Sequence, residues 1–113
     1  MAIQVNWTRN SGVLVAKPVG RVYSSDYLDW QSELESGISP DDRKLVVDFE
    51  QVPYLSSAGL RILLITAKRF TGPDHAFCVC ALTRPVRKVL AASGFDALVS
   101  VYESAEEAVA AIA

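Results

Sequence analysis

The residues best suited to chemistry or recognition lie in the segment Val52-Pro53-Tyr54-Leu55-Ser56-Ser57-Ala58-Gly59-Leu60-Arg61. The hydroxyl groups of Ser56 and Ser57 stand where a helical pattern of apolar residues begins. Backbone N–H groups in the first turn of a helix have no partner within the helix, so this position favours a negative charge. One serine could simply cap the helix. Because Ala58 and Gly59 are small enough for a phosphate or a partner to approach closely, the segment predicts a helix cap and a candidate binding site.

Residues close to the serines are candidates for partner contacts. Tyr54 and Leu55 precede them directly, and exposed aromatic anchors dominate the energetics of many interfaces. The alternative is that both side chains are buried beneath the loop, and the sequence leaves this open. A small basic cluster, formed by Arg84, Arg87 and Lys88 at the start of a later helix, is either a solvated face or a contact for an acidic partner.

The sequence lacks the motifs of common enzyme classes. Neither serine has the Gly-x-Ser-x-Gly surround of a hydrolase nucleophile, and no Gly-rich phosphate loop ends in Lys-Ser or Lys-Thr. The one histidine, His75, is expected at the end of the sheet opposite Ser57, which disfavours a catalytic triad. We therefore expect a protein that is not an enzyme, and a hydrolase with an unconventional serine nucleophile is the enzymatic alternative.

Two further groups of polar side chains are expected to have structural roles. Asp48 ends a strand, as the acceptor of a receiver domain would, but the other residues of that class are missing, so we expect it to bind nearby loop amides. Cys78 and Cys80 alternate along a strand and point to one face, which suits two core thiols better than a disulfide. With a single histidine, the usual nitrogen and sulfur ligand sets cannot be assembled, so no metal and no cofactor are expected.

Composition sets the broad class. The 113 residues are 50% hydrophobic, and 11 Lys and Arg against 13 Asp and Glu give a net charge of −2. This balance excludes a disordered tail or a coiled coil, and it gives no general attraction to nucleic acid or anionic lipid. No apolar run reaches the 18 residues of a membrane span, and the segment Met1–Asn6 does not resemble a signal peptide. We expect a cytoplasmic protein.

Hydrophobic periodicity predicts five strands and four helices that alternate after an initial hairpin. The strands are expected at 3–8, 13–16, 45–49, 76–82 and 98–102, and the helices at 27–37, 58–70, 84–94 and 104–113. This order indicates an α/β fold with a mixed, mostly parallel five-stranded sheet covered by about four helices, in a single domain over 1–113. In such a sheet, binding sites gather where strands end and helices begin, which is where Ser56 and Ser57 lie.

The stretch from Val46 to Arg61, VVDFEQVPYLSSAGLR, resembles the signature of anti-sigma-factor antagonists, the small stand-alone STAS domains of bacterial partner-switching systems. The element order and the length are similar to that family as well. Two short matches, Gly20-Arg21 and Ser93-Gly94-Phe95, also resemble family positions. The resemblance therefore covers essentially the whole chain and implies a STAS-like fold.

The resemblance implies a regulatory phosphoprotein. Its partners would be an anti-sigma factor, which is also an ATP-dependent serine kinase, and a phosphatase that resets the switch. The acceptor of the phosphate would be Ser57, with Ser56 as the second choice. Unphosphorylated protein would bind the anti-sigma factor and free the sigma factor. The implied contact residues are Tyr54, Leu55, Ser56, Ser57, Ala58, Gly59 and Arg61.

Two positions depart from the pattern of this family. Ser56 stands where many relatives have Asp, and Tyr23-Ser24 stands where many have Asp in the turn after Gly-Arg. Both changes remove negative charge from the expected contact face. An alternative role on the same fold is therefore a scaffold or accessory subunit of another complex, for example a lipid-transport ATPase, without a phosphate switch. The sequence leaves the sigma factor, the upstream signal and the oligomeric state open.

Overall fold

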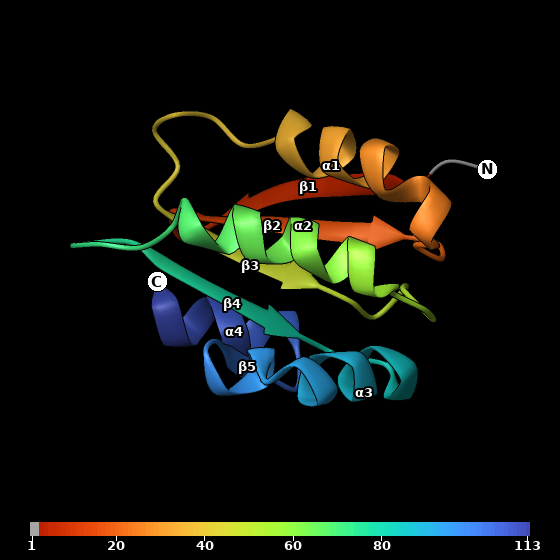
Figure 1. Ribbon diagram of the computed structural model, residues 1–113. Helices are drawn as coiled ribbons and strands as arrows, with labels where there is room; N and C mark the ends of the chain where they lie inside the picture. The colour runs from red at the N-terminus through yellow and green to blue at the C-terminus, as the bar shows by residue number, and fades with distance from the viewer. Residues whose placement is uncertain (1–2) are drawn as a thin grey trace.

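The computed structural model describes residues 3–113, which form one five-stranded sheet with helices on both faces (Figure 1). Met1 and Ala2, the start of the segment considered for a signal peptide, lie outside the described residues. The strands are β1 (Gln4–Asn10), β2 (Val13–Val19), β3 (Lys44–Asp48), β4 (Ala76–Cys80) and β5 (Ser100–Tyr102). The α-helices are α1 (Tyr27–Ser36), α2 (Ser57–Lys68), α3 (Arg84–Ser93) and α4 (Ala105–Ile112).

The sheet is mixed and mostly parallel, as predicted. Its strand order is β1-β2-β3-β4-β5, with β1 and β2 antiparallel and the other neighbours parallel. The hairpin between β1 and β2 turns at Ser11 and Gly12, both with positive φ. Because each parallel crossover moves one strand further along the sheet, the carboxyl ends of β2 to β5 share one edge. The helices α1, α2 and α3 begin at that edge.

The two faces of the sheet carry separate cores. The larger core packs α1, α2 and α3 against one face, with Trp30, Leu34 and Leu63 fully buried. The smaller core packs α4 against the other face and includes Cys78 and Cys80. Both cysteines are free thiols on one face, as predicted, and burial raises the pKa of each to about 12.

Five element boundaries lie two or three residues from the expectation: the ends of β1, β2, β4 and α2, and the start of β5. The last strand begins at Ser100 instead of Leu98, because Gly94 takes a left-handed φ of 78° and leads into a short 3-10 turn at Phe95–Ala97. The amides of Leu98 and Val99 then donate to the Phe95 carbonyl and are not available to β4. The second strand is longer than expected and runs to Val19, because β1 pairs with it along its whole length.

The longest helix, α2, has 12 residues. Among residues 3–113, no helix has the length and apolar character needed to cross a bilayer.

Candidate functional site

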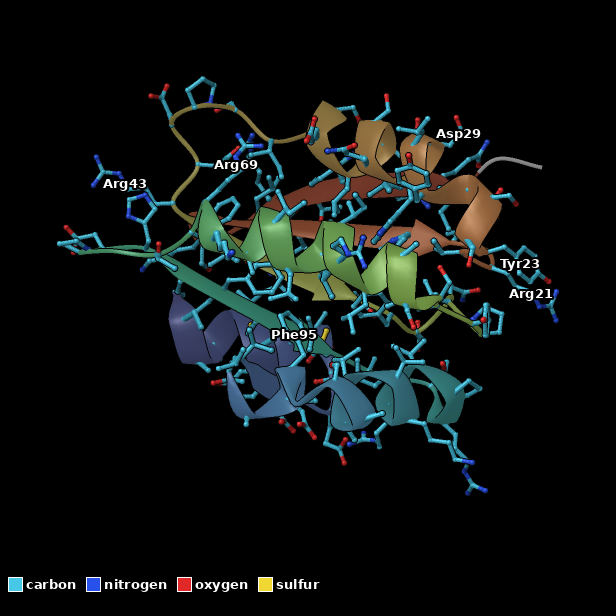
Figure 2. The ribbon with its side chains drawn as sticks, in the orientation of Figure 1. Arg21, Tyr23, Asp29, Arg43, Arg69 and Phe95 are labelled. Carbon is cyan, nitrogen blue, oxygen red and sulfur yellow. The ribbon has the colours of Figure 1, made fainter. Side chains whose placement is uncertain are left out.

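The candidate site lies at the edge of the sheet where β2, β3 and β4 end. Three segments meet there: residues 20–26 after β2, residues 49–56 after β3, and residues 81–83 after β4. In Figure 1 this is the right-hand edge, where the ribbons of α2 and α3 both begin. Arg21 and Tyr23, labelled in Figure 2, project from the first segment at the same edge.

Backbone hydrogen bonds hold the segment 49–56 against residues 20–22. Gly20 N donates to the Gln51 carbonyl at 3.0 Å, Val22 N donates to the Tyr54 carbonyl at 2.9 Å, and Ser56 N donates to the Val22 carbonyl at 2.8 Å. On the other side, the Thr83 hydroxyl donates to the Val52 carbonyl at 2.7 Å. These hydrogen bonds order the loop that ends at Ser56 and leads into Ser57, the first residue of α2.

Side-chain contacts also hold the start of this loop. Asp48 is buried, and its Oδ1 accepts a hydrogen bond from Glu50 N at 3.0 Å, which confirms its predicted role as an anchor of loop amides. Lys17 Nζ donates to Glu50 Oε1 at 2.8 Å. That contact lowers the pKa of the Glu50 carboxyl and raises the pKa of Lys17. The pair adds a surface link between β2 and the loop.

Ser56 is the cap of α2. It is 3% exposed, and its Oγ accepts a hydrogen bond from Gly59 N at 3.1 Å. An N-cap of this kind satisfies one of the otherwise unpaired amides of the first turn. Because its hydroxyl is buried and engaged, Ser56 is poorly placed for modification or for contact with a partner. Its burial argues against both expected roles of Ser56, which stay predictions.

Ser57 is the first residue of α2, and it is exposed. It lies at one end of a groove between α2 and α3 that is also lined by Arg61 and Lys88. Both cations are exposed. Adjacent serines that look equivalent in the sequence therefore differ: one closes the helix and the other faces solvent.

Two of the expected contact residues are in the core. Leu55 is fully buried, because its backbone bridges to Val22 and its side chain turns beneath the loop. Gly59 is also buried, and a Cβ there would lie 2.7 Å from Leu55 Cδ1 and 2.9 Å from Val22 Cγ1. The close approach that Gly59 permits is thus internal, and neither residue offers a side chain to a partner. Ala58 is half-buried.

Tyr54 is exposed and forms a pair with Tyr23 that sequence reasoning did not identify. Their ring centroids are 5.5 Å apart, and the side chains are 50% (Tyr23) and 39% (Tyr54) exposed. Asp26 Oδ2 accepts a hydrogen bond from Tyr23 N at 3.0 Å and fixes the turn that presents this ring. The available signal was topological, since segments that follow adjacent parallel strands lie side by side. The pair places a large aromatic surface at the same edge as Ser57.

The remaining candidates divide between the two edges of the sheet. Of the basic cluster, Lys88 lines the groove with Ser57, and Arg87 Nη2 lies 3.9 Å from Glu103 Oε2. His75 lies near Lys68, at the end of α2 away from Ser57, as predicted. Its Nδ1 is 2.9 Å from the Pro73 carbonyl oxygen. Ser57 and His75 therefore do not meet.

Comparison with known proteins agrees with this geometry. The family model of the STAS domain matches residues 4–108. BtrV of Bordetella bronchiseptica, which is named as an anti-sigma factor antagonist, is 35% identical over 100 residues, covering 88% of this chain and 86% of BtrV.

Solved structures share the fold. An anti-sigma factor antagonist from Mycobacterium paratuberculosis superposes with a TM-score of 0.87 at 23% identity, covering 98% of this chain and 94% of that one. Unphosphorylated SpoIIAA, also an anti-sigma factor antagonist, superposes with a TM-score of 0.74 at 17% identity, covering 96% and 93%.

Proposed function

The chain belongs to the STAS domain family, and we propose that it is an anti-sigma factor antagonist controlled by phosphorylation of Ser57. In this proposal the unmodified protein binds an anti-sigma factor in the cytoplasm and so frees a sigma factor. The anti-sigma factor is also the kinase that modifies Ser57, and a phosphatase reverses the modification. The observation that carries the proposal is the contrast between an exposed Ser57 and a buried, capping Ser56 at the start of α2.

The position of Ser57 suits a phosphate switch that leaves the fold intact. A kinase would transfer the γ-phosphoryl group of ATP to the Ser57 oxygen, with loss of the hydroxyl proton and release of ADP. The new group carries about −1.5 to −2 charges at neutral pH. The first turn of a helix accepts such a charge, because its amides and its dipole favour anions. The main energetic effect would then fall on the bound partner.

The partner surface would be the exposed part of the same edge. Tyr23 and Tyr54 supply an aromatic pair of the kind that dominates binding energy, and Ser57 and Arg61 lie on the adjoining start of α2. A phosphate at the border of such an interface needs to cost only about 1.4 kcal/mol to weaken binding tenfold. A modest electrostatic mismatch therefore suffices for a switch.

A paired pull-down from the lysate of the native bacterium tests this function. The baits are Ser57→Ala and Ser57→Glu, and Ser36→Glu is the matched charge control. Ser36 is an exposed serine near the end of α1, at the edge of the sheet away from Ser57. We expect Ser57→Ala and Ser36→Glu to retain a protein with an ATP-binding kinase fold, identified by mass spectrometry, and Ser57→Glu to lose it.

A different result separates the two roles that the sequence leaves open. If all three baits retain the same complex and that complex contains no kinase, the phosphate switch is wrong and the scaffold or accessory role takes its place. Phosphate detected by mass spectrometry on wild-type protein from growing cells, mapped to Ser57, is the second readout. Phosphate mapped to Ser56 alone would contradict the assignment of the acceptor.

A further inference from the structure

The groove between α2 and α3 has Ser57 at one end and positively charged side chains along both walls. Leu60, Leu64 and Val89 form its apolar floor, and Ser57 lies at its end. The charged side chains that line it are Arg61 on α2 and Lys88 on α3, with no carboxylate among the lining residues that the structure describes. The walls of the groove are therefore cationic on both sides.

Neither cation has an acidic partner within residues 3–113. The ion pairs of the described chain are Arg9–Asp42, Lys17–Glu50 and Arg87–Glu103, and they leave out Arg61 and Lys88. The neighbouring basic residue Arg87 is directed toward Glu103 instead. Two free cations beside an exposed hydroxyl form an arrangement that can receive an anion attached to that hydroxyl.

Both cations are within reach of a phosphate on Ser57. Ser57 and Arg61 are four residues apart on α2, a spacing that brings their Cβ atoms to about 5–6 Å. Lys88 extends from the opposite wall of the same groove, and its four-carbon stem lets the ammonium group move. Guanidinium and ammonium groups both form short, charge-assisted hydrogen bonds to phosphate oxygens.

We propose that a phosphate on Ser57 is held in the α2–α3 groove by Arg61 and Lys88. The phosphorylated protein thus keeps its fold and gains internal contacts, while both cations are withdrawn from the surface that a partner meets. Phosphorylation then acts twice, because it adds a dianion and it neutralises the two cations beside it. This inference rests on the proposed function only in that Ser57 is the modified residue.

Phosphorus NMR of the full chain tests the inference without any partner or kinase. Phosphoserine is installed at position 57 during synthesis of the protein, and the second pKa of the phosphate is measured from the pH dependence of its chemical shift. Nearby cations favour the dianion and lower this pKa from its ordinary value of about 6. Arg61→Gln and Lys88→Gln are each expected to raise it by roughly 0.3–0.5 pH units.

The matched control is Lys68→Gln, which removes an exposed cation from the last turn of α2 at the other edge of the sheet. It is expected to leave the phosphate pKa within about 0.1 units of the wild-type value, because its charge is screened over that distance. If Arg61→Gln and Lys88→Gln also leave the pKa unchanged, the phosphate is not held in the groove and the inference is wrong.

Failure of this inference and failure of the proposed function are distinguishable. If the phosphorylated chain releases its partner but the glutamine variants leave the phosphate pKa unchanged, only the inference that the groove holds the phosphate is wrong. Conversely, suppose that both variants raise the phosphate pKa while a partner binds phosphorylated and unphosphorylated protein equally well. That result would support the phosphate site in the groove and contradict the proposed phosphorylation switch.

Discussion

Trp30 Nε1 donates a hydrogen bond to the Gly59 carbonyl at 2.9 Å. The indole is fully buried on α1, and Gly59 lies in the first turn of α2, two residues after Ser57. The bond links the helix that follows β2 to the helix that carries the candidate phosphorylation site. The bond holds the first turn of α2 against α1, while backbone hydrogen bonds hold the preceding loop, residues 49–56, against residues 20–22.

Gly59→Ala is expected to destabilise the protein by about 1–3 kcal/mol, because the added methyl group would overlap Leu55 and Val22 in the core. Urea unfolding followed by tryptophan fluorescence measures the change. Ser57→Ala, two residues earlier and exposed, is the matched control and should stay within about 0.5 kcal/mol of wild type. Equal stability of Gly59→Ala and wild type would show that the first turn of α2 is less tightly packed than its geometry indicates.

Ser56→Ala is expected to cost about 1 kcal/mol of stability through loss of the helix cap, and to leave Ser57 available to a kinase. Ser57→Ala should do the reverse, with little effect on stability and complete loss of phosphate. Chemical denaturation and phosphopeptide mapping of protein from the native bacterium measure the two effects. A Ser56→Ala variant of normal stability, or one that carries no phosphate while folded, would contradict the division of roles.

Tyr23→Ala and Tyr54→Ala are each expected to weaken binding of the anti-sigma factor by about tenfold or more, because the two rings form one exposed aromatic surface. Their effects should not add, since each variant disrupts the same pair. Leu98→Ala, which removes a side chain that is 74% exposed, is the control. Calorimetric titration with the partner retained by Ser57→Ala measures the affinities, and a Leu98→Ala effect as large as the tyrosine effects would argue against this surface.

Asp42 is expected to make the free energy of unfolding depend on pH in the acidic range. Its carboxylate pairs with Arg9 and accepts a hydrogen bond from Ser39 N at 2.8 Å, and these contacts hold its pKa below the ordinary value of 3.8. A lowered folded-state pKa contributes stability above pH 3.8 that is lost as pH falls through the lower folded value. We expect Asp42→Ala to be about 1–2 kcal/mol less stable than wild type at pH 7.

The same difference in stability should narrow as the pH falls from about 3.8 through the lower folded-state pKa, because the Asp42 carboxylate protonates first in the unfolded chain and then in the folded protein. Thermal unfolding of both proteins from pH 7 to pH 2.5 measures it. Asp42→Asn keeps an oxygen that Ser39 N can use, so it separates the charge from the hydrogen bond. If the difference in stability between Asp42→Ala and wild type stays constant with pH, the ionised Asp42 carboxylate does not contribute to stability.

Most of the fold was predictable from local patterns. The alternation of Ile3, Val5 and Trp7 indicated a strand with one covered face, and the spacing of Leu60, Leu63 and Ala67 indicated a helix. Such patterns can be recognised locally, because apolar residues recur at every second position in a half-buried strand and at every third or fourth position in an amphipathic helix. The first residues of β5 were predicted wrongly, because the turn at Phe95 withholds the amides of Leu98 and Val99 from β4.

Within the candidate site, the sequence by itself determined the position of the serine pair at the start of a helix, since capping residues and apolar spacing are local signals. Only the tertiary structure decided that Ser56 is buried while Ser57 is exposed, and that Leu55 packs beneath the loop. Burial depends on which distant segments lie alongside, here residues 20–22 and α1. The Tyr23–Tyr54 pair and the groove shared by Ser57 and Lys88 arise for the same reason, because parallel crossovers bring distant segments to one edge of the sheet.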